Sequence, residues 1–119
     1  MKENIIHRDR LEKYLIVFNE LKFKYTGIES RCSIRNKKIT QAWEKAVNGM
    51  SDSDIDSMAK DIVKAIYAAC HSEWHKENKF KWITPEIFLR ADKLEYWTND
   101  YISNHHVNIA KPFVKNRYV

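Results

Sequence analysis

The chain has 119 residues, a formal net charge of +5, a pI near 9.2 and 13% aromatic residues, but only two glycines and two prolines. This length suffices for one domain with a buried core, and the aromatic content excludes a disordered tail protein. The N-terminus has no apolar run long enough for a signal peptide or a membrane span, so we expect a soluble, cytoplasmic protein. The cysteines Cys32 and Cys70 form no CxxC motif and predict no disulfide framework.

The first predicted element is a helix from about Arg8 to Tyr25. Its apolar residues recur at steps of three and four, which is the spacing of a helix that packs one face against a core. Gly27 follows this pattern and can adopt the left-handed conformation that ends many helices. The apolar positions of the face are Leu11, Leu15, Phe18, Leu21 and Tyr25.

Two further helices are predicted in the middle of the chain. The first follows Ser33, its expected N-cap, and extends to about Asn48. The second starts at the cap Ser51, has acidic residues in its first turn, and is expected to continue to about Glu77. The residues expected to face inward on this longest helix are Ile55, Met58, Ala59, Ile62, Ile66, Ala69 and Cys70.

Residues 83–89, Ile-Thr-Pro-Glu-Ile-Phe-Leu, carry the signals of a helix start. Thr84 is expected to cap the helix with its hydroxyl, and Pro85 suits the first helical position because its missing N–H has no partner there. Glu86 adds negative charge at the positive end of the helix dipole. Because the segment is short and apolar, we expect it to be pinned against the preceding helices as a lid.

These patterns predict an all-α fold, a compact single-domain bundle of four to five helices with a short capped lid helix. The helical domain is expected to span residues 1–99, followed by a basic C-terminal tail over residues 100–119. Most of the aromatic residues should then belong to the core. In particular, Trp43, Trp74 and Trp97 are expected to be largely buried.

Residues that could carry chemistry are few. His71 and His75 stand four residues apart, the spacing of two zinc ligands on a helix, but no third ligand is evident. The series Asp52, Asp54 and Asp56 lacks the glycine and the final glutamate of a calcium loop, so helix capping explains it better. No nucleophile elbow and no glycine-rich phosphate loop are present. We therefore expect no enzyme, no cofactor and no metal site.

A cluster of positive charges gives a clearer signal. Arg31, Arg35, Lys37 and Lys38 fall within eight residues that contain no acidic residue. They precede and open a predicted helix, so backbone N–H groups there could join the side chains in holding a phosphate. Arginine offers bidentate phosphate contacts and lysine a mobile point charge, but neither alone reads a base sequence. The cluster therefore predicts DNA binding of low sequence specificity and steep salt dependence.

A second group combines bases with aromatic residues. Lys79, Phe80, Lys81 and Trp82 alternate along one loop, and Lys93 follows in the next helical segment. Cations meet phosphates and rings stack on bases, so this group is also predicted to contact nucleic acid, through Lys79, Lys81, Trp82 and Lys93. The competing interpretation is that Phe80 and Trp82 belong to the core and the lysines are simply solvated.

Several short motifs occur in a recognisable order. A basic segment opens a helix at residues 33–39, a Gly-Met-Ser-Asp-Ser-Asp-Ile helix start lies at 49–55, and Trp74 follows late in the long helix. A Trp-Ile-Thr-Pro-Glu-Ile-Phe lid then occupies 82–88, and Lys-Leu-Glu-Tyr-Trp-Thr-Asn closes the pattern at 93–99. In order and spacing these pieces resemble the conserved C-terminal domain of phage replication (replisome-organiser) proteins.

That resemblance implies a phage or prophage protein associated with DNA replication. Its expected role is to contact DNA nonspecifically and to dock a replication partner such as a replicative helicase or a helicase loader. The alternative is a phage-encoded adaptor or inhibitor that binds a host protein without nucleic acid. The chain has a basic pole at 31–38 and an acidic pole at 52–61, so one could lie on phosphate while the other meets a basic protein surface.

Overall fold

The computed structural model describes residues 5–105, and this part of the chain contains five α-helices, one 3₁₀ helix and no strand. The all-α prediction is therefore confirmed. Within the same residues no helix is both long enough and apolar enough to cross a bilayer. The elements are α1 (Arg8–Thr26), α2 (Lys37–Val47), α3 (Asp52–Cys70), α4 (Glu73–Glu77), η1 (Pro85–Leu89) and α5 (Ala91–Asn104).

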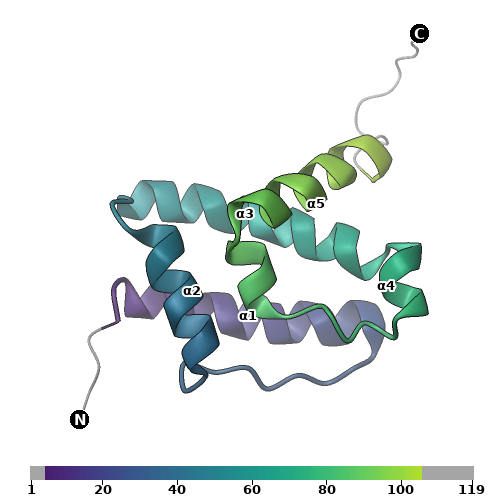
Figure 1. Cartoon of the computed structure of the whole chain (residues 1–119), viewed down its shortest axis with the longest axis horizontal. Coiled ribbons are helices and arrows are strands. Elements are labelled where there is room, and N and C mark those ends of the chain that lie inside the picture. Colours follow the sequence, from purple (N-terminus) through teal and green to yellow (C-terminus); the bar gives the residue numbers. More distant parts are fainter. Residues whose placement is uncertain (1–4, 106–119) are drawn as a thin grey trace, which may run out of the picture.

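Two long helices form the frame of the bundle (Figure 1). α1 and α3 lie lengthwise and pack on each other, and α5 lies along α3. α2 lies at the end where α1 and α3 begin, and the short α4 lies at the opposite end. The chain then returns to the middle of the bundle as η1, which contacts α2, α3 and α5. The segment predicted to be a lid therefore closes the core.

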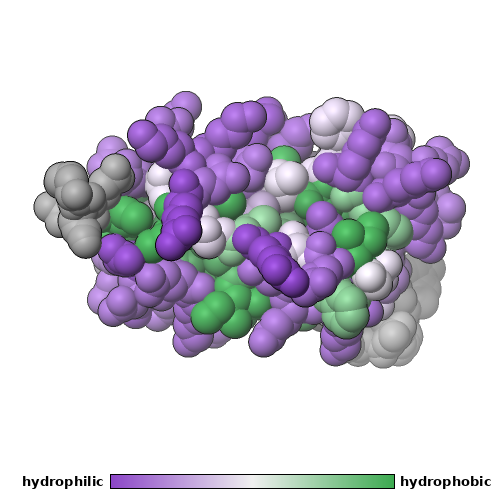
Figure 2. Space-filling view, turned by 90° about the horizontal axis from the view of Figure 1, so that it is seen from below, coloured by the Kyte–Doolittle hydropathy of each residue, from purple (hydrophilic) through white to green (hydrophobic). Residues whose placement is uncertain are grey.

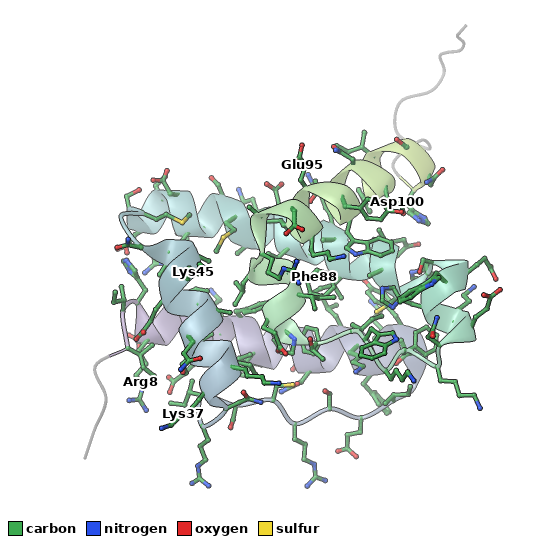
Figure 3. All side chains as sticks on the ribbon, viewed as in Figure 1. Arg8, Lys37, Lys45, Phe88, Glu95 and Asp100 are labelled. Atoms are coloured by element: carbon green, nitrogen blue, oxygen red, sulfur yellow. The ribbon has the colours of Figure 1, made fainter. Side chains whose placement is uncertain are left out.

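The core beneath η1 is aromatic. Trp43 of α2 is 1% exposed and stacks on Tyr14 of α1, with 6.5 Å between the ring centroids. Phe88 of η1 is fully buried and lies at the centre of the bundle in Figure 3. Each polar atom in this cluster has a partner, because the Tyr14 hydroxyl donates to the Pro85 carbonyl at 2.8 Å and Trp43 Nε1 donates to the Ile6 carbonyl at 2.7 Å.

The predicted helix ends are right where the capping signals are local. α1 ends at Thr26, and Gly27 has φ of 77°, as expected for a left-handed C-cap. Ser51 begins α3 with a capping box, in which its side chain accepts from the Asp54 N–H while the Asp54 carboxylate accepts from the Ser51 N–H. This reciprocal pair satisfies two N–H groups that the first turn of a helix leaves free.

Four predicted features are wrong. α2 begins at Lys37, because Asn36 and not Ser33 is its cap. α3 ends at Cys70 instead of Glu77, because the Ser72 hydroxyl accepts from the backbone three residues on and starts α4. Serine competes for backbone groups in this way, which favours a cap over a helix interior. As a result α4 is a separate turn, and Trp74 on it is 54% exposed instead of buried. Ala59 is also exposed.

The lid also differs from its predicted form. Pro85 does occupy a first helical position, but Thr84 makes no side-chain capping bond and the segment is a five-residue 3₁₀ helix. A hydrogen bond from α1 holds the chain just before this segment, because the buried Lys22 side chain donates to the Ile83 carbonyl at 2.9 Å. α5 is a distinct helix that continues to Asn104, beyond the expected boundary at residue 99. Most of the predicted basic tail, residues 106–119, lies outside the described residues.

The surface over α1 is mixed in character. Figure 2 shows the molecule from the side of α1 and its following loop, where apolar patches are separated by hydrophilic side chains. Ile16 and Phe23 of α1 are 58% and 56% exposed. An apolar groove of about 250 Å³ runs between α1 and α3, with Val17, Ile62 and Val63 among its lining residues. Arg10 and Asp56 at its rim are paired at 2.9 Å, and this contact holds the pKa of the Asp56 carboxyl below its usual range.

Candidate functional site

Two hollows open around the start of α5, and both are lined by Asp92, so they adjoin. The basic hollow, about 950 Å³, lies between α2, η1 and α5 and includes Lys38, Lys45 and Arg90. The aromatic hollow, about 650 Å³, lies between α4, the loop after it and α5. Its principal lining residues are Trp74, His75, Trp82, Lys93, Tyr96 and Trp97.

The loop between α4 and η1 shapes the aromatic hollow. α4 ends in a reversal in which the Lys79 N–H donates to the Lys76 carbonyl at 3.1 Å and the Phe80 N–H donates to the His75 carbonyl at 2.8 Å. This is the Schellman pattern of a helix C-terminus. It places Lys79 and Phe80 at φ of 57° and 62°, a left-handed conformation that is uncommon and strained for residues other than glycine.

The core interpretation of the Lys79–Trp82 loop is right for Phe80 and wrong for Trp82, and nucleic-acid contact by the loop stays a prediction. Phe80 is half-buried and packs against the core, as the core interpretation expects. Trp82 is 51% exposed and lines the aromatic hollow, as the binding interpretation expects. The Lys81 ammonium lies 5.1 Å from the centroid of the Trp82 ring, close enough for a cation–π contact. The reversal thus turns one aromatic residue inward and leaves the other on the surface.

Trp74 and Tyr96 complete the exposed aromatic surface of the hollow. Trp74 comes from α4, and Tyr96, from α5, is 62% exposed. No hydrogen bond joins the indole N–H of Trp74 or Trp82, or the Tyr96 hydroxyl, to any other residue in the range 5–105. Rings of this kind are most often buried with their polar atoms paired, so an open group is informative.

His75 lies beneath these rings. It is 3% exposed, and its ring packs against Trp74 and Trp97 at centroid distances of 4.9 and 5.2 Å. Its Nδ1 is buried and has no hydrogen-bond partner within the described residues. Burial lowers the pKa of His75 below its ordinary value of 6.5, and the positive charge of Lys93 lowers the pKa further. The ring is therefore neutral at pH 7.

The predicted DNA-binding residues divide between the hollows and the surface outside them. Lys38 lines the basic hollow, Trp82 and Lys93 line the aromatic hollow, and Lys81 lies over Trp82. The structure therefore brings half of the predicted set to one continuous depression. Lys81 itself lines neither hollow, and the same is true of Arg31, Arg35, Lys37 and Lys79.

The cluster at the start of α2 is exposed. Arg31 pairs with Glu29 at 3.4 Å, whereas Arg35, Lys37 and Lys38 form no ion pair with another residue in the described part of the chain. Figure 3 shows Lys37 pointing away from the bundle. The first turn of α2 contains no acidic residue, so these cations stand unneutralised at the positive end of the helix dipole.

The expected help from backbone N–H groups is largely absent at this cluster. The Asn36 side chain accepts from the N–H groups of both Lys38 and Ile39, at 2.9 and 3.3 Å. Donors already held by the cap are not free to bind a phosphate. Any phosphate contact at this cluster would therefore come from the side chains of Arg35, Lys37 and Lys38.

Sequence reasoning missed four residues of the two hollows, Lys45, Arg90, Trp74 and Tyr96, as site residues. The first two come from α2 and from the residue before α5, and only the fold brings them together. Trp74 did carry a local signal. Ser72 followed by an acidic residue is typical of a helix N-terminus, which predicts a break in the long helix and a new direction for the chain after the break.

The two histidines considered as zinc ligands, His71 and His75, do not lie together in the structure. His71 caps α3 and stacks on Tyr67 at 4.0 Å, with its Nδ1 2.7 Å from the Tyr67 carbonyl, whereas His75 packs on α5. Among residues 5–105 no three His, Cys, Asp or Glu side chains are placed to hold a metal ion. Cys70 is buried, and burial raises the pKa of its thiol to about 12, so it is a core residue as predicted.

Comparisons of the chain with known protein families, with curated proteins and with solved structures found no match. Function is therefore inferred from the two hollows, their charges and the sequence motifs.

Proposed function

We propose that this is a phage- or prophage-type replication-associated protein that binds DNA with low sequence specificity and has no catalytic activity of its own. The observation that carries the proposal is the exposed cluster at the start of α2. Arg35, Lys37 and Lys38 have no acidic partner among the described residues, and Lys38 extends the cluster into the basic hollow. Neighbouring like charges at a helix N-terminus repel one another and the dipole, and a bound phosphate relieves both repulsions.

The phage and replication parts of the proposal rest on the resemblance in sequence motifs. In that role the protein docks a replication partner, such as a replicative helicase or its loader, in the cytoplasm. The acidic start of α3 supports docking only in part, because Asp52 and Asp56 are engaged by Arg10 at 3.4 and 2.9 Å. Asp54 is exposed but its carboxylate also accepts from the Ser51 N–H, so among these residues Asp61 remains for a basic partner surface.

Fluorescence anisotropy with short labelled DNA at several salt concentrations tests the DNA-binding part. The triple change Arg35→Ala, Lys37→Ala and Lys38→Ala removes three phosphate contacts. In duplex DNA each contact contributes about 0.9 to the slope of log affinity against log salt, so the slope should fall by about 2.7. The fold should be retained because all three side chains are exposed.

A matched control removes three other exposed lysines, namely Lys13, Lys60 and Lys64 on α1 and α3. It changes the net charge equally but should leave the slope nearly unchanged. Equal losses in both triple variants would reduce the effect to net charge alone. If the wild-type protein shows no binding even at low salt, the DNA-binding proposal is wrong.

The second candidate function is an adaptor or inhibitor that binds a host protein without nucleic acid. The apolar groove between α1 and α3 favours it, since Val63 on its rim is 41% exposed and could receive an apolar helix of a partner. The test is capture from host lysate with and without nuclease. Capture that survives nuclease and is lost in Val63→Asp supports the adaptor, whereas capture that nuclease abolishes favours the DNA-binding protein.

A further inference from the structure

The aromatic hollow is built from rings that the fold leaves open. Trp74, Trp82 and Tyr96 are each more than half exposed, and they come from α4, the following loop and α5. Their faces surround a hollow of about 650 Å³, within the range of about 300–1,000 Å³ that is usual for ligand pockets. Exposed aromatic residues gathered at one hollow mark a binding site more often than scattered ones do.

The polar atoms of the hollow point to an occupant that offers hydrogen-bonding groups as well as flat faces. The N–H groups of Trp74 and Trp82 donate to no other residue in the described chain, and neither does the Tyr96 hydroxyl. Beneath them His75 is 97% buried and leaves Nδ1 without a partner. Buried polar atoms are normally paired, so an orphan atom under an open hollow calls for an explanation.

Positive charge lies along the same depression. Lys93 lines the aromatic hollow, and the Lys81 ammonium lies 5.1 Å from the centroid of the Trp82 ring. Lys38 and Lys45 line the basic hollow that adjoins it. Two acidic residues also line the basic hollow, Glu86 and Asp92, and Asp92, which both hollows share, is paired with Arg90 at 3.4 Å. An elongated anion with flat, polar side groups fits this arrangement.

We propose that the two hollows bind a single-stranded nucleic acid, with bases stacked on the exposed rings of the aromatic hollow and the backbone following the lysines into the basic hollow. This inference deepens the proposed function and rests on it. A duplex keeps its base faces stacked on one another, so only an unpaired strand can present them to Trp82 and Tyr96. Binding should tolerate most sequences, because every base has a face that can stack.

An aromatic groove can also take a proline-rich peptide, which packs its rings on aromatic side chains. A proline-rich peptide does not need positive charges for binding, but Lys93, Lys38 and Lys45 line the two hollows. The charges therefore favour the nucleic acid, and the peptide becomes an outcome of the test.

The experiment measures anisotropy of a labelled oligothymidylate of about 12 nucleotides, within the span of about 4–16 that one small domain covers, and of a duplex of equal length. The single strand should bind at least about 10-fold more tightly at the same salt. Trp82→Ala and Tyr96→Ala should each weaken single-strand binding about 5-fold or more, and duplex binding less than about 2-fold. Trp82→Phe, which keeps a ring, should restore most of the affinity.

Phe23→Ala is the matched control, because Phe23 is 56% exposed on α1 and lines neither hollow. Its affinity for both ligands should equal that of the wild type, and thermal unfolding of each variant verifies that it is folded.

The outcomes separate this inference from the function on which it rests. If duplex and single strand bind equally, and the Arg35, Lys37 and Lys38 triple variant weakens both, DNA binding stands and the single-strand inference is wrong. If no nucleic acid binds at low salt, both are wrong. Binding of a proline-rich peptide that is sensitive to Trp82→Ala, without binding of oligothymidylate, would also overturn it.

Discussion

The protein holds two groups of aromatic residues of similar composition and opposite character. One is the core cluster of Tyr14, Trp43 and Phe88, which is buried between α1, α2 and η1. The other is the aromatic hollow, where Trp82 and Tyr96 are more than half exposed. Each Å² of apolar surface that is removed from water stabilises a fold by roughly 25 cal/mol. The rings of the aromatic hollow contribute little of this stabilisation, because much of their surface stays in water.

The polar atoms of the two groups differ in the same way. In the core cluster the Tyr14 hydroxyl and the Trp43 N–H each have a backbone acceptor, at 2.8 and 2.7 Å. In the aromatic hollow the corresponding atoms of Trp82 and Tyr96 bond to nothing in the described chain. The core cluster pairs its polar atoms within the protein, whereas the hollow leaves those of Trp82 and Tyr96 unpaired among the described residues. Substitutions should therefore separate the two groups by their effect on stability.

The largest effect is expected for Trp43→Ala. It removes a fully buried indole from the core cluster and deletes the bond to the Ile6 carbonyl. Losses of this kind lower the free energy of unfolding by about 3–5 kcal/mol. Urea denaturation followed by circular dichroism measures the change. A loss of less than about 1 kcal/mol would mean that Trp43 does not anchor α2 to the core.

A smaller effect is expected for Tyr14→Phe. The ring stays in place, but the buried Pro85 carbonyl loses the hydrogen bond that it accepts from the Tyr14 hydroxyl. An acceptor left unpaired in the core lowers the free energy of unfolding by about 1–3 kcal/mol. Tyr96→Phe is the matched control, and it should leave stability unchanged because its hydroxyl bonds to no described residue. Equal effects in the two variants would contradict the contrast between core and hollow.

The contrast also explains which parts of the fold sequence reasoning could reach. The core face of α1 and the caps at Gly27 and Ser51 depend on neighbours within a turn, and those predictions are confirmed. The exposure of Trp74 depends on a break at Ser72 that redirects α4, and here the expectation that the tryptophans belong to the core was wrong. Periodicity shows that a ring lies on an apolar face, but not whether another element covers that face.

The candidate site was predictable to about the same extent. Lys81 and Trp82 were identified because bases and aromatic residues alternate in the sequence, and Lys93 was grouped with them as a base in the next helical segment. Arg90 and Tyr96 were not, because their place in the two hollows arises only when α5 packs beside η1 and α3. A site assembled from separate elements has no single local signature.

One substitution in the strained reversal after α4, at Lys79, should raise the free energy of unfolding, whereas the substitutions above lower it. Lys79 has φ of 57°, which glycine adopts without the penalty that other residues incur. Lys79→Gly should therefore raise the free energy of unfolding by about 1 kcal/mol while it removes a cation near the hollow. Lys81→Gly is the control, since Lys81 lacks a positive φ and should be destabilised. A loss of stability in Lys79→Gly would show that the lysine side chain stabilises the reversal.

A pH effect should be traceable to His75. Burial and Lys93 lower its pKa in the folded protein below the ordinary value of 6.5. As the pH falls below 6.5, the unfolded chain therefore takes up the proton first. The stability that the neutral ring provides is complete above that pH and is lost as the pH falls through the folded pKa. Urea midpoints between about pH 7.5 and about pH 5 should decline in the wild type and decline less in His75→Gln.

The smallest effect on stability is expected for Trp82→Ala, although it removes as large a side chain as Trp43→Ala does. Trp82 is already 51% exposed, and its N–H makes no hydrogen bond to the described residues. The contact with the Lys81 ammonium, 5.1 Å from the ring centroid, lies at the surface, where water weakens it. The free energy of unfolding should therefore change by no more than about 0.5 kcal/mol. Urea denaturation beside Trp43→Ala makes the comparison direct, and a loss of about 3 kcal/mol in Trp82→Ala would place the ring in the core and leave the hollow without its stacking surface.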